Sequence, residues 1–150
     1  MTYLDYSATT PVDNEILNCF CECSLKYPGN PNSLHSLGLK SNELINQATE
    51  QIANLLNVSS KEIIYTSGSS ESNNLAIKGI ALKYKNRGNH IITTNFEHSS
   101  IYGPIDYLVE NGFKVSFVKL DQNGLVDLND LKNLMTDETI LVSINLSSLS

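Results

Sequence analysis

The 150-residue sequence predicts an α/β fold built on a mostly parallel sheet with helices on both faces. Short runs rich in β-branched residues alternate with helical patterns through the second half of the chain, which is the order of elements in α/β proteins. The predicted strands are apolar on both faces, as parallel strands between two helical layers are. The connections between them are long enough for crossovers.

The first half of the chain predicts two helices. Thr10 is expected as the N-cap of the first helix and Pro11 as its first helical residue, with Asp13 in an acidic first turn and an end near Lys26. A segment rich in Pro, Gly and Asn follows and predicts a turn. Apolar residues then recur at helical spacing, which predicts a second helix that ends at about Asn57.

The second half predicts strands and helices in alternation. The expected strands are "EIIYTS" (62–67), "HIITTN" (90–95), "KVSFVKL" (114–120) and "TILVSIN" (139–145). The expected helices run from about Ser70 to Arg87, up to Asn111 and Gly112, and for a short stretch after Asp127.

Composition restricts the class of protein. A content of 41% hydrophobic and 17% charged residues suits a globular chain that buries a sizeable core. Ten basic against sixteen acidic residues give a net charge of -6, which provides no electrostatic footprint for nucleic acid or an anionic membrane. The sequence has no apolar run of about 20 residues and no basic secretion signal at its start, so a cytoplasmic location is expected.

The three cysteines form one cluster, "CFCEC", at Cys19, Cys21 and Cys23. On a helix only Cys19 and Cys23, four residues apart, share a face. A tetrahedral zinc site usually takes paired ligands from two places in the chain, and the sequence has no second cluster. We therefore expect free thiols in a reducing compartment and no metal site.

The stretch "EIIYTSGSSESNNLAIKG" (62–79) runs from a predicted strand through small polar residues into a predicted helix. The start of such a helix presents unpaired N–H groups and a positive dipole end, which together favour an anion. Gly68 allows close approach of the backbone, and Ser69 and Ser70 add hydroxyl donors, so a phosphate monoester would fit. The stretch matches neither a P-loop nor a dinucleotide motif. The alternative is a plain turn with Ser as an N-cap.

A histidine follows the next predicted strand. In "HIITTNFEHSSI", Glu97 and His98 come after the strand and therefore lie at the same edge of the sheet as Ser69 and Ser70. An imidazole there could stack on a planar cofactor or transfer protons near neutral pH. The alternative for a single His after a strand is a surface or helix-capping residue.

Four motifs together resemble the cysteine desulfurase family, which are pyridoxal phosphate enzymes of aminotransferase class V and fold type I. They are "YLDYSATTPV" (3–12), "GNPNSLHSLG" (29–38), "IIYTSGSSESNNLAIKG" (63–79) and "HIITTNFEHSSIYGPIDYLVENGFKV" (90–115). The resemblance runs in register from Tyr3 to about Asn145.

The resemblance implies a homodimeric enzyme that removes sulfur from L-cysteine, leaving alanine. The sulfur passes as a persulfide to an acceptor or scaffold protein for iron-sulfur cluster assembly or thiolation. By position, Gly68, Ser69 and Ser70 would bind the phosphate of pyridoxal 5'-phosphate, with Ser69-Ser70 standing where the family commonly has Ala-Thr. His98 matches the family's catalytic histidine, which stacks on the pyridine ring and takes part in proton transfer. Asn30 lies in a loop that resembles the rim of the active site.

The resemblance breaks after Asn145, where the family continues with Asn-Asn-Glu and this chain has Leu146 to Ser150. The family's ring-binding Asp, its cofactor-binding lysine, its catalytic cysteine and its substrate-binding Arg are expected further downstream, and the cysteine cluster does not match the catalytic position. We expect residues 1–15 to form an N-terminal segment and residues 16–150 a truncated part of the cofactor-binding large domain, inactive alone. Selenocysteine lyase, another class V pyridoxal enzyme and a non-catalytic truncated chain remain alternatives.

Overall fold

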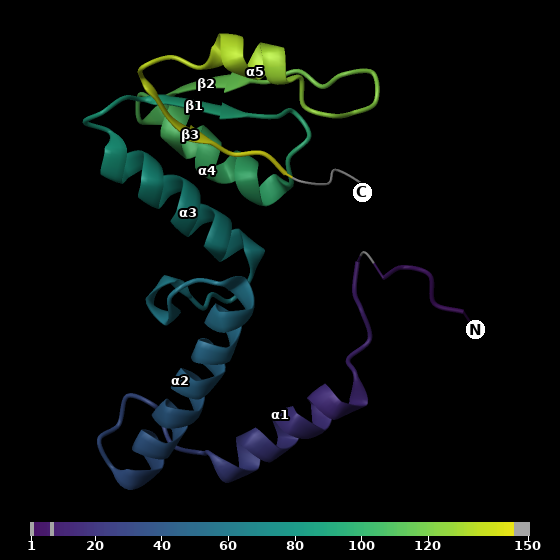
Figure 1. Cartoon of the computed structure of the whole chain (residues 1–150), viewed down its shortest axis with the longest axis vertical. Helices are drawn as coiled ribbons and strands as arrows, with labels where there is room; N and C mark the ends of the chain where they lie inside the picture. The colour runs from purple at the N-terminus through teal and green to yellow at the C-terminus, as the bar shows by residue number, and fades with distance from the viewer. Residues whose placement is uncertain (1, 7, 146–150) are drawn as a thin grey trace. The chain divides into compact units, whose positions relative to one another are not determined.

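The computed structural model describes residues 2–6 and 8–145. The chain divides into two compact units, one up to Tyr65 and one from Thr66 onward. Figure 1 shows the helices of the first unit and the α/β arrangement of the second. The expected change at residues 146–150 lies outside the described residues.

The first unit consists of helices. Its elements are α1 (Asn14–Lys26), α2 (Ser36–Leu56) and the short 3-10 helix η1 (Ser60–Glu62).

The start of α1 corrects the sequence prediction, because the N-cap is Asp13 and not Thr10. The Asp13 carboxylate accepts a hydrogen bond from the N–H of Glu15 at 2.7 Å. The Thr10 hydroxyl instead donates to the carbonyl of Tyr6 at 3.3 Å. A carboxylate near the positive helix end is a strong cap, so the helix begins at the acidic residue and not three residues earlier.

The end of α2 agrees with the prediction. Asn57 is the C-cap, with a left-handed backbone (φ 55°, ψ 44°), and its N–H bonds to carbonyls of the last helical turn. Asn tolerates this conformation better than most residues, so it commonly ends helices.

The second unit is a parallel α/β layer. Its elements are α3 (Ser69–Tyr84), β1 (His90–Thr93), α4 (Ser99–Glu110), β2 (Lys114–Phe117), α5 (Leu128–Leu134) and β3 (Thr139–Val142). The strand order is β2-β1-β3, and β1 pairs in parallel with both neighbours. In Figure 1, α3 and α4 lie on one side of the sheet and α5 on the other. The predicted parallel sheet with helices on both faces is confirmed.

One predicted strand is absent from the described residues. The stretch 62–67 was expected to pair, but it forms the end of η1 and an unpaired extended segment, in which Ile63 has φ -87° and ψ 123°. Ile64 and Tyr65 are 69% and 58% exposed. β-branched residues favour an extended backbone, but a strand also requires a hydrogen-bonded neighbour, which no local pattern supplies.

The core of the second unit lies between the sheet and the helix pair α3 and α4. Ile91 and Leu108 are fully buried in it. The buried cluster consists of Ile77, Ala81, Ile91, Ile101, Ile105, Leu108 and Phe113. Removal of this apolar surface from water holds the two helices against the strands.

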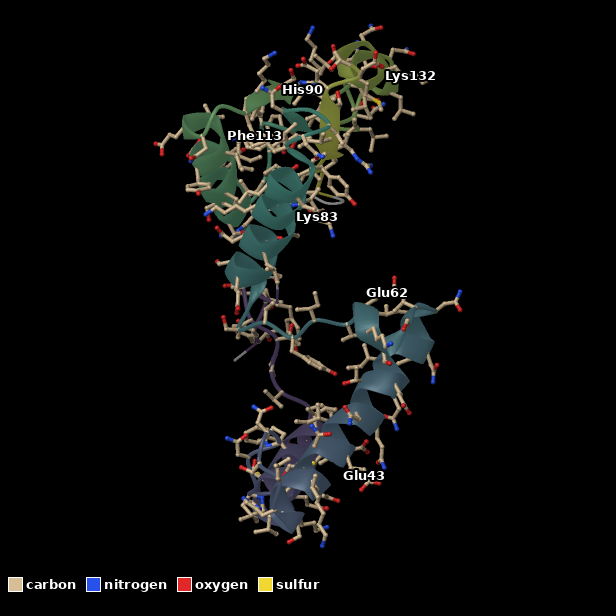
Figure 2. The ribbon with its side chains drawn as sticks, turned by 90° about the vertical axis from the view of Figure 1, so that its left-hand side faces the viewer. Glu43, Glu62, Lys83, His90, Phe113 and Lys132 are labelled. Carbon is tan, nitrogen blue, oxygen red and sulfur yellow. The ribbon has the colours of Figure 1, made fainter. Side chains whose placement is uncertain are left out.

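His90 joins the three strands at their amino ends. Its Nδ1 lies 2.8 Å from the hydroxyl of Thr139 on β3, and its Nε2 lies 2.9 Å from the hydroxyl of Ser116 on β2. Both ring nitrogens of this buried side chain therefore have partners, as buried polar groups require. Figure 2 labels His90 and the core residue Phe113 in this unit. None of the helices in the described part of the chain is long and apolar enough to span a bilayer.

Candidate functional site

The start of α3 presents free donors at the edge of the second unit. Gly68 is the N-cap and contributes no side-chain bond, and Ser69 and Ser70 are exposed. No hydrogen bond of the described residues uses the hydroxyl of Ser69 or Ser70. A Cβ added at Gly68 would meet nothing within 4 Å, so the space before the helix is open. First-turn N–H groups, two hydroxyls and a positive dipole end form a donor set that fits a phosphate monoester.

Glu71 holds the turn that precedes these donors. Its Oε2 accepts from the backbone N–H of Ser67 at 2.6 Å and from the Ser67 hydroxyl at 2.7 Å. The backbone hydrogen bond, and then the hydroxyl, keep the pKa of the Glu71 carboxyl below its usual value. Because this carboxylate bonds to Ser67, it fixes the loop and leaves Ser69 and Ser70 available.

His98 caps α4 with its imidazole. Nδ1 accepts from the N–H of Ser100 at 3.2 Å and lies 2.9 Å from the Ser100 hydroxyl. An acceptor Nδ1 places the proton of the neutral ring on Nε2. The structure thus gives His98 the capping role that the sequence left open, and this role orients the ring.

A hydrogen bond links the helix that begins at Ser69 to the helix that His98 caps. The Asn73 amide, in the first turns of α3, donates to the hydroxyl of Ser100 in α4 at 2.8 Å. Ser100 in turn contacts His98. The helix that begins at Ser69 is therefore connected to the imidazole through two side chains. Asn73 is not among the residues predicted from the sequence, although its spacing of three residues from Ser70 places both on one helix face.

A cavity of about 290 Å³ lies at the carboxyl ends of β1 and β3. Parallel α/β sheets bind ligands at this edge. The cavity is lined by Asn73, Glu97, His98, Ile101, Ser143, Ile144 and Asn145.

Glu97 is a buried member of this lining, with 9% exposure. Its Oε1 accepts from the hydroxyl of Thr94 and from the backbone N–H of Asn145, both at 2.9 Å. The carboxylate therefore connects the segments that follow β1 and β3.

Two other residue groups noted in the sequence have local roles. Asn30 accepts from the N–H of Asn32 in the turn before α2, at 2.9 Å. On α1, Cys19 and Cys21 are exposed free thiols and Cys23 is partly buried. Partial burial and the adjacent Cys19 raise the pKa of the Cys23 thiol. No cluster of metal-ligating side chains that could hold an ion occurs in residues 2–6 and 8–145.

The parallel sheet with helices on both faces defines an α/β domain. The chain belongs to the aminotransferase class-V family, whose model matches residues 2–149. It is 46% identical over 142 residues to the cysteine desulfurase IscS of Clostridium botulinum (strain Hall), covering 95% of this chain and 36% of that protein. The chain thus spans about a third of the length of the curated relatives it matches.

Two solved structures show the same fold. A NifS-like protein superposes with a TM-score of 0.87 at 39% identity, over 91% of this chain and 38% of that one. A structure described as SspA in complex with cysteine gives a TM-score of 0.87 at 34% identity, over 96% of this chain and 42% of that one. The predicted family resemblance and the partial aminotransferase fold are confirmed.

Proposed function

We propose that this chain is the N-terminal part of a pyridoxal phosphate-dependent cysteine desulfurase. The full protein would convert L-cysteine to L-alanine and pass persulfide sulfur to an acceptor or scaffold protein for iron-sulfur cluster assembly or thiolation. The observation that carries the proposal is the 46% identity to a cysteine desulfurase over 95% of the chain, which includes both helix starts of the site.

The residues present suit pyridoxal 5'-phosphate. Gly68, Ser69 and Ser70 would hold its phosphate, because the start of α3 offers N–H and hydroxyl donors with open space before them. His98 would stack on the ring and hold or move a proton at Nε2, since its Nδ1 is engaged in the helix cap. When bound, the cofactor supplies an electron sink for bond cleavage at the substrate carbon.

The remaining parts of the proposal concern the full protein. The lysine that binds the cofactor and the nucleophilic cysteine are proposed to lie beyond residue 150, and the working form is proposed to be a homodimer in the cytoplasm. L-cysteine as substrate is supported by the neighbouring structure that was solved in complex with cysteine. The 150-residue chain alone is expected to release no alanine from cysteine.

The test uses the full-length protein that carries this chain. Alanine and sulfur release from cysteine, with selenocysteine as a second substrate, measures the activity.

Ser70→Ala and Ser69→Ala form a matched pair for the phosphate site, compared by cofactor loss during dialysis. We expect the larger loss for Ser70→Ala, since Ser70 stands where the family has a hydroxyl; one charge-assisted hydrogen bond contributes roughly 1.5–3 kcal/mol. Equal loss rates would contradict the phosphate assignment, and absence of alanine release would contradict the function.

A further inference from the structure

The carboxylate of Glu97 extends the connection between β1 and β3 beyond the end of their ladder. Directly after β3, the N–H of Ser143 donates to the carbonyl of Ile92 in β1 at 2.9 Å. Beyond this bond, the Glu97 carboxylate connects the two segments, because it accepts hydrogen bonds from the Thr94 hydroxyl and from the N–H of Asn145. Two segments 48 residues apart in the chain are thereby held together at the edge where the cavity lies.

The backbone of Glu97 is fixed as well as its side chain. Its N–H donates to the phenol oxygen of Tyr102 in α4 at 3.2 Å. His98 is the next residue and begins the cap of α4. The position of the imidazole and the position of Asn145 on the other wall of the cavity therefore depend on the same residue.

We propose that Glu97 is a positioning residue for the cofactor ring. Its hydrogen bonds keep the two cavity walls that carry His98 and Asn145 at a fixed separation, so that the imidazole meets the ring in one orientation. This inference rests on the proposed function, because the ring is that of the proposed cofactor. Loss of the carboxylate removes the hydrogen bond from the Asn145 N–H to Glu97 and loosens the contact between the two walls.

Two substitutions distinguish positioning from general stability. Glu97→Gln keeps an oxygen in the same place and can accept both hydrogen bonds, whereas Glu97→Ala removes the acceptor. Glu110→Ala is the control, because Glu110 is an exposed glutamate at the end of α4. All three are made in the full-length protein, which is studied with bound cofactor and, for amide exchange, after the cofactor has been removed.

Three measurements are compared. Amide hydrogen exchange at Asn145 in the cofactor-free protein reports the hydrogen bond between the Asn145 N–H and Glu97. In the holoenzyme, the circular dichroism of bound pyridoxal phosphate reports the ring environment, and kcat per bound cofactor reports its orientation. For Glu97→Ala we expect about tenfold faster exchange at Asn145, a changed cofactor signal and about tenfold lower kcat per bound cofactor with little change in KM. Glu97→Gln and Glu110→Ala are expected to remain within about threefold of the original protein.

The outcomes separate this inference from the function it rests on. Original protein that binds no pyridoxal phosphate would overturn both. Original protein that binds it, together with a Glu97→Ala variant that keeps the cofactor signal and kcat per bound cofactor, would overturn the positioning role alone. A Glu97→Gln variant as impaired as Glu97→Ala would also overturn it, because the hydrogen bonds would then not be what matters.

Discussion

His98 combines a helix cap and an imidazole, and two substitutions separate these roles. His98→Ala removes both. His98→Asn removes the imidazole but keeps a short side-chain acceptor for the Ser100 N–H, which His98 Nδ1 now binds at 3.2 Å. Asn is among the best N-cap residues and Ala among the poorest, so the pair is well matched for this comparison.

The magnitudes follow from the geometry. Loss of an N-cap acceptor costs about 0.5–2 kcal/mol. For a unit of the size of residues 66–150, which contains His98, His98→Ala is therefore expected to lower the melting temperature by roughly 4–8 °C for each kcal/mol lost. His98→Asn is expected to melt within about 2 °C of the original chain, since the cap bond can reform. In the full-length protein both variants are expected to lose about 100-fold or more in turnover, because neither retains a group that exchanges protons near neutral pH.

The assay combines melting with activity. The chain has no Trp, so thermal unfolding of the 150-residue chain is followed by far-ultraviolet circular dichroism. Alanine release and cofactor content are measured on the full-length variants, and turnover is divided by bound cofactor. Equal destabilisation by Ala and Asn would refute the capping role, and near-normal turnover in His98→Asn would refute the need for the imidazole.

Three further perturbations test the packing and electrostatics of the second unit. Leu108→Ala, at a fully buried position, is expected to lower the free energy of unfolding by about 2–5 kcal/mol in urea titrations; a loss below about 1 kcal/mol would contradict the described core. Gly88→Ala would press a Cβ against the backbone of Glu138, so a loss of roughly 1–3 kcal/mol is expected, and an unchanged urea midpoint would show that the turn yields freely. The pKa of Glu71 is lowered in the folded protein, so the ionised carboxylate stabilises the fold fully above the ordinary pKa of 4.5. This contribution is lost as the pH falls through the folded-state pKa. The stability deficit of Glu71→Gln is therefore expected at neutral pH and should vanish in acid; a deficit independent of pH would exclude this cause.

Sequence patterns predicted the elements whose ends depend on local chemistry. Asn57 ends α2 in a left-handed conformation, and Asp127 caps α5 through the N–H groups of Asn129 and Asp130. Gly112 follows α4 with φ 88°, a conformation that favours glycine. In each case one residue type satisfies the geometry of its own position, so no distant contact had to be known.

Of the two failures, one depends on a distant part of the chain and the other is local. The segment 62–67 has the residue preferences of a strand, but pairing depends on a neighbour elsewhere in the chain. At the start of α1, Thr10 and Asp13 both satisfy the rules for an N-cap, and the carboxylate prevails in the structure. N-cap preferences rank Asp above Thr, and the error came from taking Pro11 as the first helical residue, which placed the cap at Thr10.

The candidate site shows the same division. His98 was proposed from the sequence because it follows a predicted strand, which the structure shows as β1, whereas Gly68 and Ser70 were proposed after a predicted strand that the described residues do not form. The Asn73–Ser100 bond spans 27 residues and the Glu97–Asn145 bond spans 48, so no pattern in the sequence contains them. Sequence patterns thus proposed individual residues, and the structure supplied the bonds between segments that lie far apart in the chain.

The acidic balance of the chain bears on how the start of α3 would hold an anion. A net charge of -6 gives a field that repels anions at long range and is screened over about 8–10 Å at physiological salt. The donors at Ser69 and Ser70 act only at hydrogen-bond distance, so binding there depends on their placement and not on attraction from afar. The two bonds from Ser67 to Glu71 fix the turn immediately before these donors. It follows that Glu71, although itself an anion beside the proposed phosphate site, would support binding there by holding the donors in place.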